Sequence, residues 1–196
     1  MKTSLIKMFR VSLSAALLCA GLWFVFMSAT GVKAGNDNRE PILPTPLCDS
    51  IQVSADNHVA YHVYARGVQI YKWTGESWAF VAPAADLYAD ANYRGKVGTH
   101  YGGPTWESNS GSKVIGSRVP GTGCAPDANA IPWLLLKAIS TKGPGIFHKV
   151  SYIQRVNTVG GLAPTAPGTT IDEVVEVPYT AEYFFYRAQN HDAAEQ

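Results

Sequence analysis

The chain has 196 residues, of which 16 are lysine or arginine and 15 are aspartate or glutamate. Four of the basic residues and none of the acidic ones precede residue 35, so residues 35–196 carry 12 basic and 15 acidic side chains, a net charge of about −3. No basic stripe remains, which argues against a nucleic-acid partner, and the length suits one domain with a buried core.

Residues 1–34 have the pattern of a secretory signal peptide. A start with three basic residues precedes an uncharged, apolar run over residues 11–27, and Val32 and Ala34 occupy the −3 and −1 positions of a cleavage site. An uncleaved anchor is the alternative, but a membrane span usually needs about 20 apolar residues. We therefore expect a secreted or periplasmic protein that keeps no membrane span after cleavage.

Two cysteines, Cys48 and Cys124, follow the predicted cleavage site. An even pair in an exported chain predicts one disulfide, the alternative being two buried free thiols. The segment before the first of them, residues 35–49, is polar and holds three prolines. We expect this segment to be flexible, with little to pack against.

From residue 51 onward, short runs of β-branched and aromatic residues alternate with turn residues. Val68–Trp73 and Trp78–Val81 flank the four-residue segment Thr74–Ser77, which predicts a β-hairpin. Other strands are predicted over residues 58–65, 86–89, 96–101, 105–107, 113–119, 131–139, 146–156, 171–177 and 179–187.

Residues 131–139 also suit a short buried helix, but Pro132 near the start of this run and the turn at 142–145 favour a long hairpin with residues 146–156. No sustained 3.6-residue apolar stripe appears after residue 50. The chain is therefore predicted to be all-β, with one antiparallel sandwich or barrel over residues 50–188, long Gly/Pro-rich loops and a frayed tail at 189–196.

The stretch from Gly98 to Gly116 gathers the most chemistry. His100, Tyr101, Trp106 and Glu107 flank the turn Gly102-Gly103-Pro104. If the turn brings His100 and Glu107 together, the imidazole can serve as acid, base or ligand, with the carboxylate tuning it. Trp106 and Tyr101 can form a wall for a ring-shaped ligand. The alternative is that the glycines only shape a tight turn and both aromatic residues belong to the core.

Two further pairs carry weaker signals. Arg155 and Asn157 are two residues apart on a predicted strand, where they can hold an anion or a sugar, unless Arg155 is a structural arginine paired with Glu107 or Asp86. His58 and His62 also share a predicted strand face, but no third zinc ligand follows nearby, so we predict an exposed polar face and no metal site.

The sequence holds no Gly-x-Ser-x-Gly elbow, and no Gly-x-Gly-x-x-Gly that follows a strand and opens a helix. We therefore assign no nucleophile and expect no cofactor.

Several motifs resemble the uncharacterised family catalogued as domain of unknown function 3455. They are residues 66–71 (Arg-Gly-Val-Gln-Ile-Tyr), 98–107, 130–136, 153–161 and the ending 177–186. The resemblance covers residues 50–188 and implies an exported protein without a settled activity. Many members have a cysteine where this chain has Trp73 and another within the loop at 165–170, so the resemblance transfers no disulfide pattern.

We expect an exported all-β module that binds a small molecule or glycan through the hairpin at 98–107, with His100, Tyr101, Trp106, Glu107, Arg155 and Asn157 as ligand-binding residues. The alternatives are a metal-assisted enzyme that uses His100 and Glu107, and a structural envelope protein.

Overall fold

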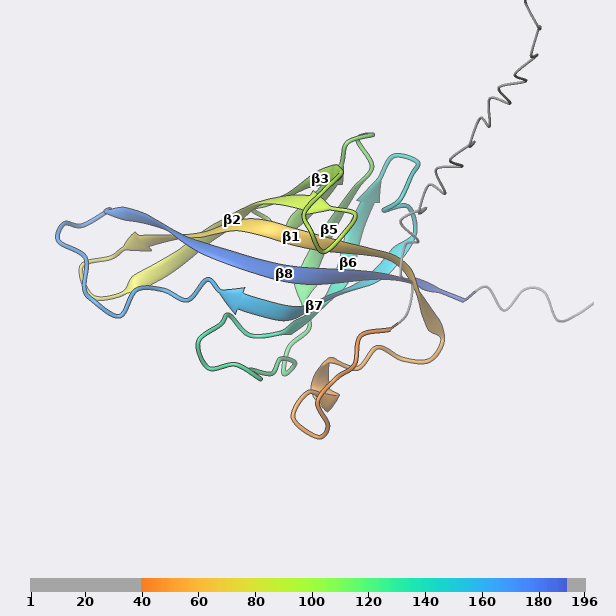
Figure 1. The fold of residues 1–196 in the computed structure, drawn as a ribbon, viewed down its shortest axis with the longest axis horizontal. Coiled ribbons are helices and arrows are strands. Elements are labelled where there is room, and N and C mark those ends of the chain that lie inside the picture. Colours follow the sequence, from red (N-terminus) through yellow and green to blue (C-terminus); the bar gives the residue numbers. More distant parts are fainter. Residues whose placement is uncertain (1–39, 190–196) are drawn as a thin grey trace, which may run out of the picture. The chain divides into compact units, whose positions relative to one another are not determined.

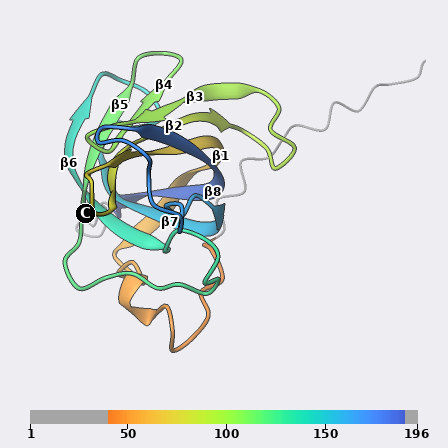
Figure 2. The ribbon, with the colours of Figure 1, turned by 90° about the vertical axis from the view of Figure 1, so that its left-hand side faces the viewer.

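The computed structural model describes residues 40–189, which form a closed antiparallel barrel of eight strands (Figure 1). Each strand pairs with the next in the chain, and β8 pairs with β1. The strands are β1 (Asn57–Trp73), β2 (Trp78–Tyr88), β3 (Lys96–Tyr101), β4 (Thr105–Ser108), β5 (Lys113–Arg118), β6 (Leu134–Lys142), β7 (Val150–Gly160) and β8 (Val174–Ala188). The all-β prediction is confirmed, and of the two architectures left open the barrel is the observed one (Figure 2).

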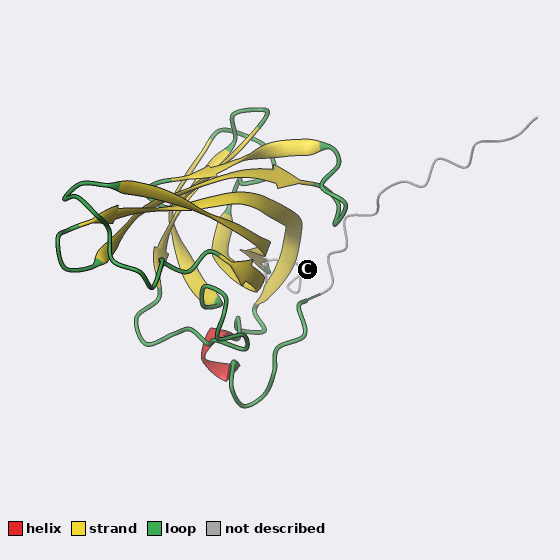
Figure 3. Cartoon of the chain, turned by 60° about the vertical axis from the view of Figure 1, so that its left-hand side comes forward, coloured by secondary structure: helices red, strands yellow, loops and turns green. Residues whose placement is uncertain are grey.

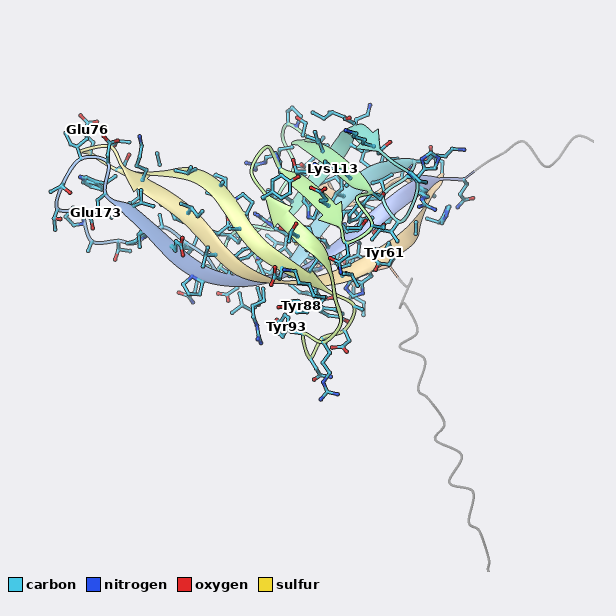
Figure 4. The ribbon with its side chains drawn as sticks, turned by 90° about the horizontal axis from the view of Figure 1, so that it is seen from above. Tyr61, Glu76, Tyr88, Tyr93, Lys113 and Glu173 are labelled. Carbon is cyan, nitrogen blue, oxygen red and sulfur yellow. A yellow bond between two sulfur atoms is a disulfide. The ribbon has the colours of Figure 1, made fainter. Side chains whose placement is uncertain are left out.

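Strands β1, β2 and β8 extend beyond the barrel as a three-stranded ribbon, here called the tongue (residues 69–82 and 171–178). Its tip carries the predicted hairpin, in which Trp73 pairs with Trp78. Figure 4 shows Glu76 and Glu173 at this tip, far from Lys113 on the barrel. The tongue therefore projects from one end of the barrel.

Three predicted strand breaks are absent from the structure, one of them at residues 82–85, through which β2 runs. Strand β1 runs without interruption through Gly67, and β8 runs through Pro178. Gly67 serves close packing rather than a turn, because a Cβ atom there would collide with Ala84 O and lie 2.4 Å from Ala85 Cα. The glycine lets β2 approach β1 at the point where the tongue leaves the barrel.

The barrel interior is filled by one apolar cluster. Trp106, Phe147, Tyr179, Tyr183 and Phe185 are its largest buried members. The indole of Trp106 fits because Gly116, two residues beyond its β5 partner Val114, has no side chain: an added Cβ there would lie 3.2 Å from the indole. Because glycine has no side chain, the indole of Trp106 can fill the space beside it in the core.

A second apolar cluster lies outside the barrel wall, under the N-terminal segment 40–53. The short 3₁₀ helix η1 (Asp49–Ile51), red in Figure 3, belongs to this segment. The predicted disulfide between Cys48 and Cys124 is confirmed, and Gln154 Nε2 donates a 2.8 Å hydrogen bond to Ile51 O. Part of the segment that we expected to have little to pack against does pack: Cys48 is fully buried and Leu43 packs on this cluster.

The predicted signal peptide at 1–34 and most of the predicted tail, from residue 190 on, lie outside the described residues. Between residues 40 and 189, no helix is both long enough and apolar enough to cross a membrane.

Replacing both cysteines (Cys48→Ala with Cys124→Ala) should lower the free energy of unfolding by about 4 kcal/mol, because the bridge closes a long loop in the unfolded chain. Urea unfolding of the double variant measures this loss, and wild-type protein reduced with dithiothreitol should match the variant. A loss below about 1 kcal/mol would show that packing alone holds the N-terminal segment.

Candidate functional site

The β3–β4 hairpin divides its polar residues between two faces of the barrel wall. His100 lies directly opposite Trp106, whereas Glu107 lies opposite Thr99. Opposed residues of an antiparallel pair project to the same face, and successive residues alternate. His100 and Trp106 therefore face the interior, while Tyr101 and Glu107 face outward. The prediction that the turn brings His100 and Glu107 together is wrong, because the ladder keeps its period of two up to the turn.

The outward residues form a surface cluster with Lys113. Tyr101 donates a 2.6 Å hydrogen bond to Glu107 Oε2, and Lys113 Nζ lies 2.9 Å from the same oxygen. These two contacts hold the pKa of Glu107 below its ordinary value. The cluster is a solvated ion pair and not a wall for a ring, because Trp106 lies on the other side of the sheet.

The inward residues form a stacked pair. The rings of His100 and Trp106 are 4.3 Å apart and nearly parallel, and the edge of Tyr183 contacts both. His100 Nδ1 lies 2.8 Å from Thr105 O, and because a carbonyl only accepts, Nδ1 carries the proton. Burial lowers the pKa of His100 to about 3. The imidazole is therefore neutral near pH 7, and its Nε2 is a hydrogen-bond acceptor.

Behind this hairpin, a cavity of about 260 Å³ occupies the end of the barrel beside the tongue. We call it the barrel-end cavity. Its apolar lining consists of Phe80, Val81, Pro83, Pro104, Trp106, Leu134 and Leu136. Its polar side chains are Gln69, His100, Arg118, Arg155 and Tyr183, with Gly102 and Gly103 at the hairpin turn.

The cavity has an exposed rim and a buried floor. Phe80 and Val81, from the tongue, are 55% and 54% exposed, whereas His100 and Trp106 are 3% and 1% exposed. A molecule can therefore enter over the tongue and reach a floor made of aromatic rings.

Of the predicted site residues, Arg155 joins His100 and Trp106 in this cavity. It lies opposite Tyr183 on β8 and Leu134 on β6, so it faces the interior. Its Nε and Nη2 atoms donate to Pro132 O at 3.2 and 2.7 Å. The alternative prediction, in which Arg155 pairs with Glu107 or Asp86, is therefore wrong.

Asn157 is separated from Arg155 by a β-bulge. The register shifts between Val156 and Val159, and Asn157 has a φ of 49°. Its Nδ2 donates a 3.0 Å hydrogen bond to Glu182 on the outer face. The prediction that Arg155 and Asn157 share a face is wrong, because the extra residue reverses the alternation.

A second bulge, between Val59 and Tyr61, separates His58 from His62. His58 is exposed, whereas His62 is buried against Phe184 and lies 2.8 Å from Glu182. Burial alone would raise the pKa of Glu182, but its hydrogen bonds with His62 and Asn157 outweigh that effect and lower it. Over residues 40–189, no three metal-binding side chains lie close enough to hold an ion.

The polar floor has more hydrogen-bonding capacity than the protein uses. Gln69 Nε2, Trp106 Nε1 and the Tyr183 hydroxyl in the cavity, and the Tyr179 hydroxyl outside its lining, are buried and make no hydrogen bond of standard geometry within the described structure. The Tyr179 hydroxyl interacts with Tyr183 and Gln69, and the Tyr183 hydroxyl with Arg155, only outside that geometry. Folded proteins pair the large majority of such atoms, because each unpaired one costs about 1–3 kcal/mol. This concentration of unpaired atoms in one region distinguishes the barrel end from the rest of the core.

Sequence reasoning missed Gln69, Arg118 and Tyr183. Each continues the inward-facing positions of its strand: Gln69 follows Val63 and Ala65, and Arg118 follows Val114. The available signal was a polar residue at a position where the alternation of the strand predicts an inward-facing apolar one. Finding the cavity also required knowing that three strands far apart in sequence, β1, β5 and β8, meet at one end of the barrel.

Comparison with known proteins gives a family without an activity. A family model described as "Protein of unknown function (DUF3455)" matches residues 54–187, so the chain belongs to this family. No curated protein and no solved structure matches the chain.

The buried neutral histidine should make stability depend on pH. In the unfolded chain His100 takes up a proton near pH 6.5, whereas in the folded protein it stays neutral to about pH 3. The free energy of unfolding should therefore fall as pH drops from 6.5 towards 3, by up to about 1.4 kcal/mol per pH unit from this group.

Urea unfolding between pH 4 and 7 tests this dependence. The matched variant His100→Asn keeps a donor for Thr105 O but does not titrate, so its stability should fall less steeply with acidification. Parallel curves for the two proteins would contradict the burial of a neutral His100.

Proposed function

We propose that this DUF3455 protein is an exported binding module that takes up one small, mostly apolar molecule in the barrel-end cavity. The observation that carries the proposal is the cavity itself, with apolar walls, a rim open at the tongue and a buried floor of polar groups. Ligand sites in proteins share this composition, in which apolar walls supply affinity and a few polar groups orient the ligand.

The size of the cavity limits the ligand. A cavity of about 150 Å³ accommodates benzene. The barrel-end cavity, at about 260 Å³, suits a substituted ring, a fused pair of rings or a short chain. An eight-stranded barrel is wide enough to hold one small ligand. Here the core fills the interior below Trp106, so only the end beside the tongue is available.

The contacts on the outer face of the β3–β4 hairpin also support a ligand site inside the barrel. Tyr101, Glu107 and Lys113 already satisfy one another on that face. The inner face holds the stacked rings of His100 and Trp106 beside an arginine. We therefore place the ligand inside the barrel, against the inner face of the hairpin, and not on the outer surface of the hairpin.

The disulfide and the N-terminal sequence both support export of the protein. The disulfide between Cys48 and Cys124 is typical of proteins that leave the reducing cytoplasm. The basic start and apolar run of residues 1–34 have the order of a secretory signal. We propose a secreted or periplasmic location.

Titration with the neutral fluorescent probe 1-naphthylamine, a fused pair of rings, tests the proposed site. Binding should be saturable at one molecule per chain. Val81→Trp at the exposed rim and Leu134→Trp on the wall should each weaken it at least 10-fold, because the larger ring occupies the cavity. Tyr101→Phe on the outer face is the matched control and should bind as the wild type does.

Absence of saturable binding, or equal binding by Val81→Trp and the wild type, would contradict the proposal. Either result would favour the structural role that the sequence also allows.

A further inference from the structure

We infer that the ligand of the barrel-end cavity is an organic carboxylate, whose anionic head binds Arg155 and Arg118 while its apolar body rests on the cavity walls. This inference rests on the proposed function and adds the chemical class of the ligand.

The charge of the cavity is one-sided. Two of its lining residues are arginines, and none of those in the described part of the chain is acidic. Within residues 40–189, neither arginine forms an ion pair: Arg155 donates to Pro132 O, and Arg118 Nη2 donates to Thr122 O at 3.0 Å. Carbonyl oxygens accept hydrogen bonds without neutralising the guanidinium charge. The cavity therefore favours an anion over a neutral or cationic guest.

The two arginines are placed to act on one head group. Arg118 on β5 lies opposite Leu136, and Arg155 on β7 lies opposite Leu134, so the arginines flank the same stretch of β6. Strands two apart in a sheet are separated by about 10 Å. Both side chains lie on the interior face, where two long guanidinium side chains can span that distance from opposite sides.

Donors remain available on both guanidinium groups. A guanidinium has five N–H donors in a planar fork. Arg155 directs two of them at Pro132 O and also interacts with the Tyr183 hydroxyl, and Arg118 directs one at Thr122 O, which leaves donors unused on both forks. A planar carboxylate matches such a fork, because its two oxygens accept two parallel hydrogen bonds.

The neighbouring residues do not compete for this head group. His100 adds no positive charge near pH 7, and the nearby carboxylates are engaged elsewhere: Glu107 with Lys113 outside the barrel, and Asp86 with Lys96. The apolar body can then lie against Phe80, Leu134 and Trp106. One ring system with one carboxylate fits this division of the cavity.

Calorimetric titration with three probes of one shape tests the inference: 2-naphthoate, the neutral 2-naphthamide and the dianionic 2-naphthyl phosphate. The wild type should bind naphthoate at least 10-fold more tightly than naphthamide and more tightly than the phosphate. Arg155→Gln and Arg118→Gln should each reduce the preference for naphthoate over naphthamide to less than about 3-fold, because each removes one positive charge at the head group.

Arg66→Gln is the matched control, because Arg66 is an exposed arginine of β1 whose guanidinium lies over the Tyr93 ring, 3.8 Å from its centroid. Figure 4 shows Tyr93 beside Tyr88 at the loop after β2. The control should keep the full preference. If Arg155→Gln does not fold, Arg118→Gln and the wild-type ratio still decide the question.

The outcomes separate this inference from the proposed function. If naphthamide binds as tightly as naphthoate, the cavity binds ligands but the carboxylate inference is overturned. Tighter binding of the phosphate overturns the choice of carboxylate as the head group. If no probe binds, the proposed function fails together with the inference.

Discussion

Side-chain alternation around a closed barrel determines which residues of this protein can meet a ligand. Closure by the pairing of β1 with β8 removes the free edges, so each strand position faces either the interior or the outside. His100, Trp106, Arg155 and Tyr183 occupy interior positions on four different strands and meet at one end. Tyr101 and Glu107 are sequence neighbours of two of them, yet they face solvent on the other side of the wall.

The interior end of the barrel departs from what stability alone would select. A neutral buried histidine, and buried indole, amide and hydroxyl groups that make no hydrogen bond of standard geometry within residues 40–189, cost free energy that leucine or phenylalanine would not. Stabilising contributions lie elsewhere, in the filled core below Trp106 and in the N-terminal segment that the disulfide fixes over a second apolar cluster. Such a division is expected where a fold supports a binding site.

The fold class could be predicted because its signals are local. Short alternating runs, the turn at 74–77 and a single pair of cysteines each need only neighbouring residues or a count. Closure could not be predicted, because the pairing of β1 with β8 joins residues more than 100 positions apart. The predicted strands stop beside Gly67 and Pro178, but the observed strands continue through both.

The site was predicted in part, and its errors have two causes. At the β3–β4 turn the alternation holds and keeps His100 and Glu107 on opposite faces, whereas at two bulges on other strands it fails. His100, Trp106 and Arg155, three of the predicted ligand-binding residues, line one cavity, but a strict period of two fails at each bulge. One extra residue turns Asn157 away from Arg155, and another separates His58 from His62. No local pattern marks these insertions, because they follow from the twist and closure of the whole sheet.

The central claim is that ligands enter the barrel end and present an acid to its arginines. The most direct measurement is a crystal structure with bound 6-bromo-2-naphthoate, in which anomalous scattering locates the bromine. The account predicts a single bromine peak within the barrel-end cavity near Phe80 and Leu134, with the carboxylate on Arg155 and Arg118. A peak on the outer face beside Tyr101 and Lys113, or a carboxylate directed away from both arginines, would contradict it.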